Sequence, residues 1–136
     1  MTPVHQFYNS IVPKNSGQWK FGDGRGYYNL VFYTFGTGFG AGIILDGKLY
    51  SGTNDNAGEI GHVRISDYGP VGYGKSGSIE GFCSGSGIAK IGQNLALEQI
   101  QQGKTVSFCP DGDLSSITAK SIAIAADNGD ETARRV

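Results

Sequence analysis

The sequence predicts an α/β fold in which a mixed sheet, built around a β-hairpin, is flanked by helices. Extended segments rich in aromatic and β-branched residues occupy the first half of the chain, on either side of an Asp-Gly pair. In the second half, apolar residues recur at helical spacing. The 136 residues can bury a core as one domain, but a complete two-lobed enzyme is not expected at this length.

Composition argues against several classes of partner. The 11 basic and 12 acidic side chains give a formal net charge of −1, which favours neither nucleic acid nor an anionic membrane. No apolar run approaches the roughly 20 residues of a membrane span. Residues 1–10 lack the basic and apolar regions of a secretory signal. A cytoplasmic protein with two reduced, bland cysteines, Cys83 and Cys109, fits this composition best.

Four extended segments are expected in the first half of the chain. Tyr27–Phe35 has the composition of a strand, and Ile43–Leu45 predicts a second one. Asp46 and Gly47 then suit a type I′ turn, in which both central residues have positive φ, and Lys48–Ser51 returns the chain. His62–Ile65 alternates polar and apolar residues, which indicates another short strand.

Helices are expected from residue 79 onward. Apolar residues recur at helical spacing over Ile79–Gln102, and the glycine-rich stretch Ser84–Gly87 divides this segment into two helices. Asp113–Ser116 offers N-cap residues for a last helix over Ile117–Asn128. Asp130 is placed to cap a further helical turn.

The glycine-rich run Gly36–Gly42 is the first candidate for a binding site. Glycine allows consecutive backbone N–H groups to turn inward around phosphate oxygens, and the Thr37 hydroxyl adds a donor. On this basis Gly36, Thr37, Gly38, Phe39 and Gly40 are candidate nucleotide-binding residues. A plain glycine-rich hairpin is equally compatible with the run by itself.

A second nucleotide motif competes with the first. Gly69–Ser76 matches the G-x₄-G-K-S pattern of a P-loop, inside a glycine-rich loop over Asp67–Ser78. A P-loop lies between a buried parallel strand and a helix that starts at the Gly-Lys-Ser. Here the preceding strand alternates, and the glycines that follow disfavour such a helix. Lys75 is therefore expected to be a solvated loop residue.

Three segments together resemble the ROK (repressor/ORF/kinase) family in order and spacing: Phe35–Gly52, Ala57–His62 and Gly77–Glu80. The resemblance covers residues 19–136 and leaves 1–18 as an irregular lead-in. It implies an incomplete actin-like (ribonuclease H-like) ATPase lobe. The implied activity is glucokinase-like: ATP-dependent 6-phosphorylation of a hexose or N-acylhexosamine, with ATP and Mg²⁺ in the complete enzyme.

The resemblance also implies roles for individual residues. Glu59, His62 and Glu80 correspond to sugar-binding positions, and a carboxylate can accept hydrogen bonds from two adjacent hydroxyls. Zinc-binding members carry three cysteines after the histidine, where this chain has Val71, Tyr73 and Ser78. No zinc is therefore expected.

The lack of a catalytic base is the main departure from the family pattern. The Asn-Asp pair of complete members would fall at Asn9-Ser10, where serine replaces the aspartate base and Pro13 follows. The first phosphate loop and the adenine-binding region are also not found in the sequence. No catalytic residue is assigned, and the isolated chain is not expected to transfer phosphate. The alternative is a sugar-sensing remnant, and uncovered apolar surface predicts a homo-oligomer.

Overall fold

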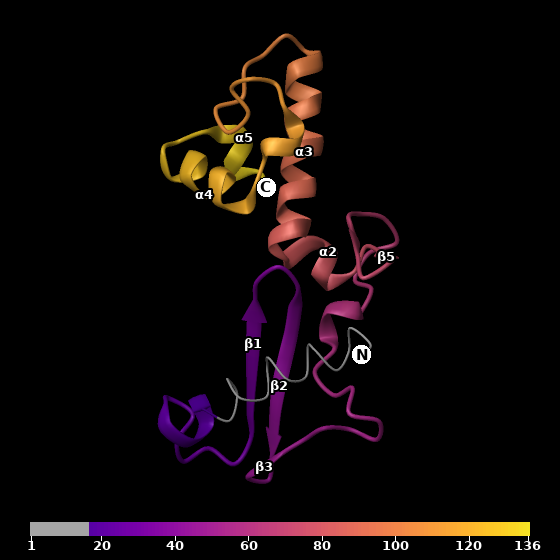
Figure 1. Cartoon of the computed structure of the whole chain (residues 1–136), viewed down its shortest axis with the longest axis vertical. Coiled ribbons are helices and arrows are strands. Elements are labelled where there is room, and N and C mark those ends of the chain that lie inside the picture. Colours follow the sequence, from indigo (N-terminus) through magenta and orange to yellow (C-terminus); the bar gives the residue numbers. More distant parts are fainter. Residues whose placement is uncertain (1–16) are drawn as a thin grey trace.

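The computed structural model describes residues 17–136, which form an elongated α/β arrangement (Figure 1). Its strands are β1 (Leu30–Phe35), β2 (Phe39–Leu45), β3 (Lys48–Leu49), β4 (Val71–Gly72) and β5 (Lys75–Ser76). Its helices are α2 (Ile79–Cys83), α3 (Gly85–Gln101), α4 (Ala119–Asp127) and α5 (Glu131–Arg134), with 3₁₀ turns η1 (Ile60–His62) and η2 (Leu114–Ser116). The sheet of order β1-β2-β3 stands at one end, and α3 leads from its closed hairpin end to α4 and α5 (Figure 1). The predicted α/β class is confirmed, and every strand pairing within residues 17–136 is antiparallel.

The Asp-Gly turn between β2 and β3 follows the prediction. Asp46 and Gly47 have φ of 49° and 69°, as a type I′ turn requires, and β3 returns beside β2. β1 is shorter than expected, because Tyr27 and Tyr28 precede it and the carbonyl of Tyr28 accepts from the N–H of Gly47 outside the ladder. β2 is longer than expected and begins at Phe39, so the second half of the glycine run is strand.

The division of the long helical segment is confirmed at Ser84. This buried serine ends α2 and begins α3, and its Oγ accepts a hydrogen bond from the N–H of Gly87 at 3.0 Å. α4 begins at Ala119, two residues later than expected, because Thr118 is its N-cap and forms a capping box with Ser121. Residues 117 and 118 are therefore extended or capping residues and not the first helical turn.

The main apolar core lies among the helices. Gly92 lets α3 approach α4 closely, since a Cβ there would overlap the Ile122 side chain. In the sheet, the buried side chains are Phe39, Ala41 and Ile44 of β2. The buried members of the helical core are Ala96, Val106, Phe108, Cys109, Ile117, Ile122, Ala125 and Ala133.

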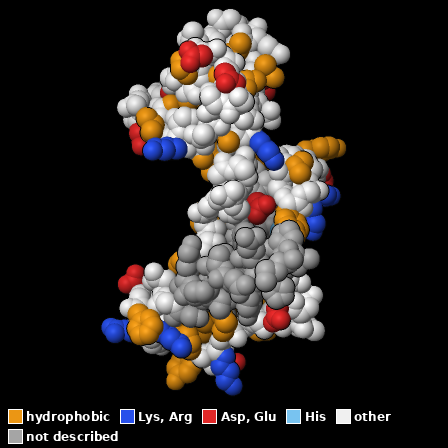
Figure 2. All heavy atoms as spheres, in the orientation of Figure 1, with side chains coloured by type: hydrophobic (Ala, Val, Ile, Leu, Met, Phe, Trp, Pro, Cys, Tyr) orange, Lys and Arg blue, Asp and Glu red, His pale blue; other side chains and the backbone are white. Residues whose placement is uncertain are grey.

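The surface agrees with the balanced composition. On the face drawn in Figure 2, basic and acidic side chains are scattered over both ends of the molecule and neither sign forms a continuous patch. Val31, Tyr33 and Phe35 are exposed along β1. No helix within residues 17–136 is long and apolar enough to cross a bilayer.

Asp130 joins two segments of the helical part, and we expect Asp130→Ala to lower the free energy of unfolding by about 1 kcal/mol. Its carboxylate accepts from the N–H of Ala133 at 2.9 Å, as N-cap of α5, and from both the N–H and the hydroxyl of Ser107. Burial raises the pKa of Asp130, but the hydrogen bonds from Ser107 and from the backbone outweigh it, so the pKa is lowered from 3.8.

The sign of the pH dependence follows from that direction. A carboxylate with a lowered pKa in the folded chain adds stability that is present above pH 3.8 and is lost as the pH falls through the folded value. Denaturant unfolding should therefore show that Asp130→Ala lowers the free energy of unfolding more at pH 7 than at pH 3. Asp111→Ala, at an exposed loop position, is the control and should change little at either pH.

Candidate functional site

Glu59 and His62 form the first part of the site, on the turn η1. Residues three apart eclipse one another in a 3₁₀ turn, so the E-x-G-H spacing places both side chains on one side. Glu59 Oε2 lies 3.3 Å from His62 Nε2, and each side chain is about 20% exposed. The predicted strand His62–Ile65 is wrong: the chain turns at Ile60–His62, and only Arg64 forms a single bridge, with Ser78.

Contacts with β2 explain why this segment turns. Gly58 has φ of 96°, and its carbonyl accepts from the N–H of Ala41 at 2.8 Å. A Cβ at Gly58 would overlap the Ala41 carbonyl oxygen, and one at Gly61 would overlap that of Phe39. Both glycines therefore allow the backbone of η1 to lie directly against the start of β2.

Glu80 joins the carboxylate cluster to the glycine run. It lies in the first turn of α2, whose N-cap is the buried Ser78. Glu80 Oε2 accepts a hydrogen bond from the backbone N–H of Phe39 at 3.0 Å. The Cβ of Glu80 also lies 3.3 Å from where a Cβ of Gly61 would stand. The structure thus brings the three predicted sugar residues, Glu59, His62 and Glu80, to one place beside the hairpin.

The two carboxylates are close enough for the charge of one to affect the pKa of the other. Burial raises the pKa of Glu59 above 4.5, proximity to His62 opposes this shift, and the nearby negative charge of Glu80 adds to it. A partly buried carboxylate of this kind has unused acceptor capacity that a hydroxyl-bearing ligand can satisfy.

Fewer residues of the glycine run are available to bind a ligand than predicted. Gly40 belongs to β2, and the N–H of Phe39 is already taken by Glu80. The exposed Thr37 and its neighbour Gly38 form the tip of the hairpin, and their backbone N–H groups have no hydrogen-bond partner among residues 17–136. These two N–H groups and the Thr37 hydroxyl are the donors that could contact a phosphate oxygen.

The start of α3 supports this hairpin tip. The N–H of Gly85 donates to the carbonyl of Gly36 at 2.8 Å, and the Ser86 hydroxyl donates to the carbonyl of Thr37 at 3.3 Å. Both contacts use carbonyl oxygens of the tip, so they hold the loop without consuming its N–H groups.

The P-loop alternative is excluded by the fold of Gly69–Ser76. This segment contains the small hairpin β4–β5, and Lys75 and Ser76 are strand residues, while the next helix starts at Ile79. A P-loop requires a helix that begins at the Gly-Lys-Ser itself. Lys75 Nζ donates instead to the backbone carbonyl of His62 at 3.3 Å.

We therefore expect Lys75→Met to leave nucleotide affinity within about fivefold of the unchanged chain, because an exposed lysine contact is worth under about 1 kcal/mol. Titration with a non-hydrolysable ATP analogue provides the measurement. The opposite pattern, with binding lost in Lys75→Met but retained in Gly38→Ala, would restore the P-loop interpretation.

The three positions at which the family resemblance would place zinc ligands make other contacts here. Val71 lies in β4 with its side chain exposed, and Ser78 caps α2 and donates to the carbonyl of Gly72 at 3.1 Å. The Tyr73 ring stacks on the imidazole of His62, with centroids 3.7 Å apart. Within residues 17–136, no three His, Cys, Asp or Glu side chains gather as metal ligands. The absence of zinc stays a prediction.

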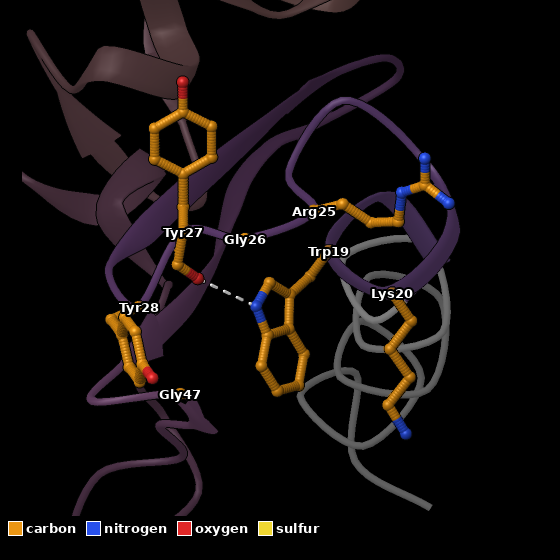
Figure 3. Close-up of a pocket in the computed structure, with 7 residues that line it drawn as sticks. All are labelled: Trp19, Lys20, Arg25, Gly26, Tyr27, Tyr28 and Gly47. Carbon is orange, nitrogen blue, oxygen red and sulfur yellow. Dashed lines mark hydrogen bonds between the residues drawn. The ribbon is translucent and has the colours of Figure 1, made fainter.

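Sequence reasoning missed two features. Tyr73 contacts His62 across ten residues, and no local pattern signals such a pair. A cavity of about 370 Å³ is lined by Trp19, Lys20, Arg25, Gly26, Tyr27, Tyr28 and Gly47, with Trp19 Nε1 donating to the carbonyl of Tyr27 (Figure 3). Gly47 lies at the opposite end of β2 from Phe39, so this cavity is separate from the carboxylate cluster.

The predicted replacement of the base at Asn9-Ser10, with Pro13 after it, lies outside the described residues. In the described residues, the fold places a glycine-rich loop beside a pair of carboxylates and a histidine. The family model of the ROK family matches residues 9–136, and the chain belongs to this family.

Comparison with individual proteins supports this assignment. A glucokinase of Halalkalibacterium halodurans is 39% identical over 121 residues, which are 87% of this chain and 35% of the relative. An N-acetylmannosamine kinase of Escherichia coli O157:H7 is 36% identical over 109 residues, 79% of this chain and 31% of the relative. The chain thus spans about a third of the length of these relatives.

Solved structures show the same fold. A ROK family glucokinase from Streptomyces griseus, in complex with glucose and AMPPNP, matches with a TM-score of 0.69 and 32% identity over 86% of this chain and 38% of that one. A ROK family transcriptional regulator, a homolog of the E. coli MLC protein, matches with a TM-score of 0.61 and 28% identity over 86% of this chain and 28% of that one. The same lobe therefore occurs in kinases and in a regulator.

Proposed function

We propose that this chain is the sugar-binding and phosphate-contacting part of an ATP-dependent sugar kinase. The observation that carries the proposal is the hydrogen bond from the N–H of Phe39 to Glu80 Oε2 at 3.0 Å. It fixes a carboxylate of the candidate sugar site to the end of the candidate phosphate loop. Phosphoryl transfer depends on positioning, so the sugar hydroxyl and the phosphate must be held next to each other.

The proposed sugar is a hexose or an N-acylhexosamine. Glu59 and Glu80 provide acceptors for adjacent hydroxyl groups, and His62 adds a donor or an acceptor. Kinases named for glucose and for N-acetylmannosamine among the relatives support this substrate class. The proposed reaction in the complete enzyme is phosphorylation at the 6-hydroxyl.

The proposed phosphate contacts are the Thr37 hydroxyl and the N–H groups of Thr37 and Gly38, which have no hydrogen-bond partner in the described part of the chain and suit a phosphate oxygen. Mg²⁺, when bound with ATP in the complete enzyme, would neutralise charge on the phosphate oxygens. We assign no described residue to the metal. Consistent with the serine expected at the position of the base, we infer that the 136 residues bind without transferring phosphate.

Calorimetric titration of the chain with glucose and with N-acetylmannosamine tests the proposal. Saturable binding of one of these sugars is expected, and a coupled assay with ATP should detect no ADP formation. A chain that binds neither sugar would contradict the proposed site. ADP formation that depends on sugar and disappears in Glu59→Ala would contradict the inferred lack of turnover.

Sugar sensing is a second candidate, supported by the regulator among the matching structures. It makes the same prediction for sugar binding but requires no nucleotide. Repeating the titration with AMPPNP separates the two: saturable AMPPNP binding favours the kinase part, and sugar binding with no AMPPNP binding favours sensing.

A further inference from the structure

The turn between β4 and β5 has an unusual residue at its first position. β4 and β5 pair Gly72 with Lys75, which leaves a two-residue turn of Tyr73 and Gly74. Both have positive φ, 47° for Tyr73 and 72° for Gly74, as in a type I′ turn. Such turns favour Asn-Gly or Gly-Gly, and a bulky side chain at positive φ is a backbone outlier. A tyrosine here opposes the local backbone preference, so a role for its side chain is indicated.

That side chain lies on His62. The Tyr73 ring and the imidazole are nearly parallel, at 13°, with centroids 3.7 Å apart. The imidazole Nε2 also lies 3.3 Å from Glu59 Oε2. Lys75 Nζ, from two positions later in the same hairpin, donates to the carbonyl of His62. His62 is thus held at its ring face, at one ring nitrogen and at its main chain.

The hairpin that presents Tyr73 is itself anchored. Lys90 Nζ of α3 donates to the carbonyl of Val71 at 2.8 Å, and Ser78 Oγ donates to the carbonyl of Gly72 at 3.1 Å. A Cβ at Gly72 would overlap the N–H of Gly81, so β4 lies directly against α2. The ring is therefore fixed relative to the helix that carries Glu80.

From these contacts we infer that Tyr73 is a positioning residue: its ring fixes the orientation of the His62 imidazole toward the sugar. This inference rests on the proposed function for the role of His62. An aromatic face restrains the tilt of a stacked ring, and the carboxylate of Glu59 restrains its rotation. Together they hold the imidazole ready for a hydroxyl before the sugar arrives, which lowers the entropy lost on binding.

Tyr73→Asn is the informative variant, because it creates the Asn-Gly pair that a type I′ turn favours and removes the ring. Lost stacking and relieved backbone strain oppose each other, so the Tm should stay within roughly 3 °C. The carbon-bound imidazole protons of His62 should shift downfield in proton NMR, as the shielding of the stacked ring disappears. Sugar affinity should fall about fivefold, as loss of one aromatic pair predicts.

Two further variants complete the experiment. Tyr73→Phe keeps the ring and should keep both the imidazole shifts and the affinity. Tyr68→Ala, at a tyrosine that is 84% exposed and lies five residues earlier, is the matched control and should change neither. The chain has two histidines, so a His5→Gln background leaves a single imidazole to observe.

Unmoved His62 resonances in Tyr73→Asn, or a Tyr73→Phe variant as impaired as Tyr73→Asn, would overturn the inference. Shifted resonances with unchanged sugar affinity would overturn its functional part. If the unchanged chain binds no sugar, the proposed function fails, while the resonances still decide whether Tyr73 orients His62.

Discussion

Replacing Gly58 by alanine is expected to lower the free energy of unfolding by about 3 to 4 kcal/mol. The new Cβ would overlap the carbonyl oxygen of Ala41, and the backbone at φ of 96° disfavours any side chain. Relief requires η1 to move away from β2, which breaks the 2.8 Å hydrogen bond from Ala41 to Gly58. Thermal unfolding should show a Tm lower by roughly 10 to 15 °C.

Gly129→Ala is the matched control for this substitution. Gly129 has a similar φ of 91°, but an ideal Cβ there meets no atom within 4 Å. The control should therefore show the backbone strain alone, about 1 kcal/mol. An equal loss of stability in both variants would mean that close packing of η1 on β2 contributes nothing beyond the glycine conformation.

Local chemistry was sufficient to predict much of the fold. Asp46 and Gly47 made the turn that their sequence favours, Ser84 divided the helical segment, and Asp130 capped α5. In each case the residue forms its turn or cap with residues a few positions away, so the local sequence contains the necessary information.

The errors arise where distant contacts decide the backbone. The alternation of His62–Ile65 predicted a strand, but Gly58 and Gly61 bring the chain just before it against β2, where Ile60–His62 form a 3₁₀ turn. Asp67–Ser78 was expected to be a glycine-rich loop, but it contains the hairpin β4–β5, whose Tyr73-Gly74 turn is not a typical type I′ pair. Tertiary contacts override local preference at both places.

In the candidate site, too, the sequence pattern predicted the residues but not the contacts between distant segments. The family pattern located Glu59, His62 and Glu80, and the structure gathers all three beside the hairpin. It did not show that Glu80 accepts from the N–H of Phe39, so that among residues 17–136 the loop N–H groups without a hydrogen-bond partner are those of Thr37 and Gly38. Such a bond joins residues 41 positions apart and has no signal in spacing along the chain.

The second large effect is expected on ligand binding: Glu59→Gln should weaken sugar affinity by about 2 kcal/mol, or roughly 30-fold. The amide keeps the size of the side chain but loses the charge that strengthens hydrogen bonds from hydroxyl groups. Calorimetry with the sugar that binds the unchanged chain provides the measurement. Glu98→Gln, the same substitution at an exposed position of α3, should bind as the unchanged chain does.

The pKa of Glu59 allows a loss of sugar affinity in this variant to be distinguished from a loss of folding. Because burial raises that pKa above 4.5, the folded chain holds the proton more tightly than the unfolded chain, and ionisation costs stability as the pH rises above 4.5. Glu59→Gln removes this cost, so at pH 7 the variant should be at least as stable as the unchanged chain while it binds sugar more weakly. Sugar affinity of the unchanged chain should rise with pH through the same range, and that rise should be absent from the variant. Weaker binding accompanied by a lower Tm would instead identify Glu59 as a residue that supports the fold.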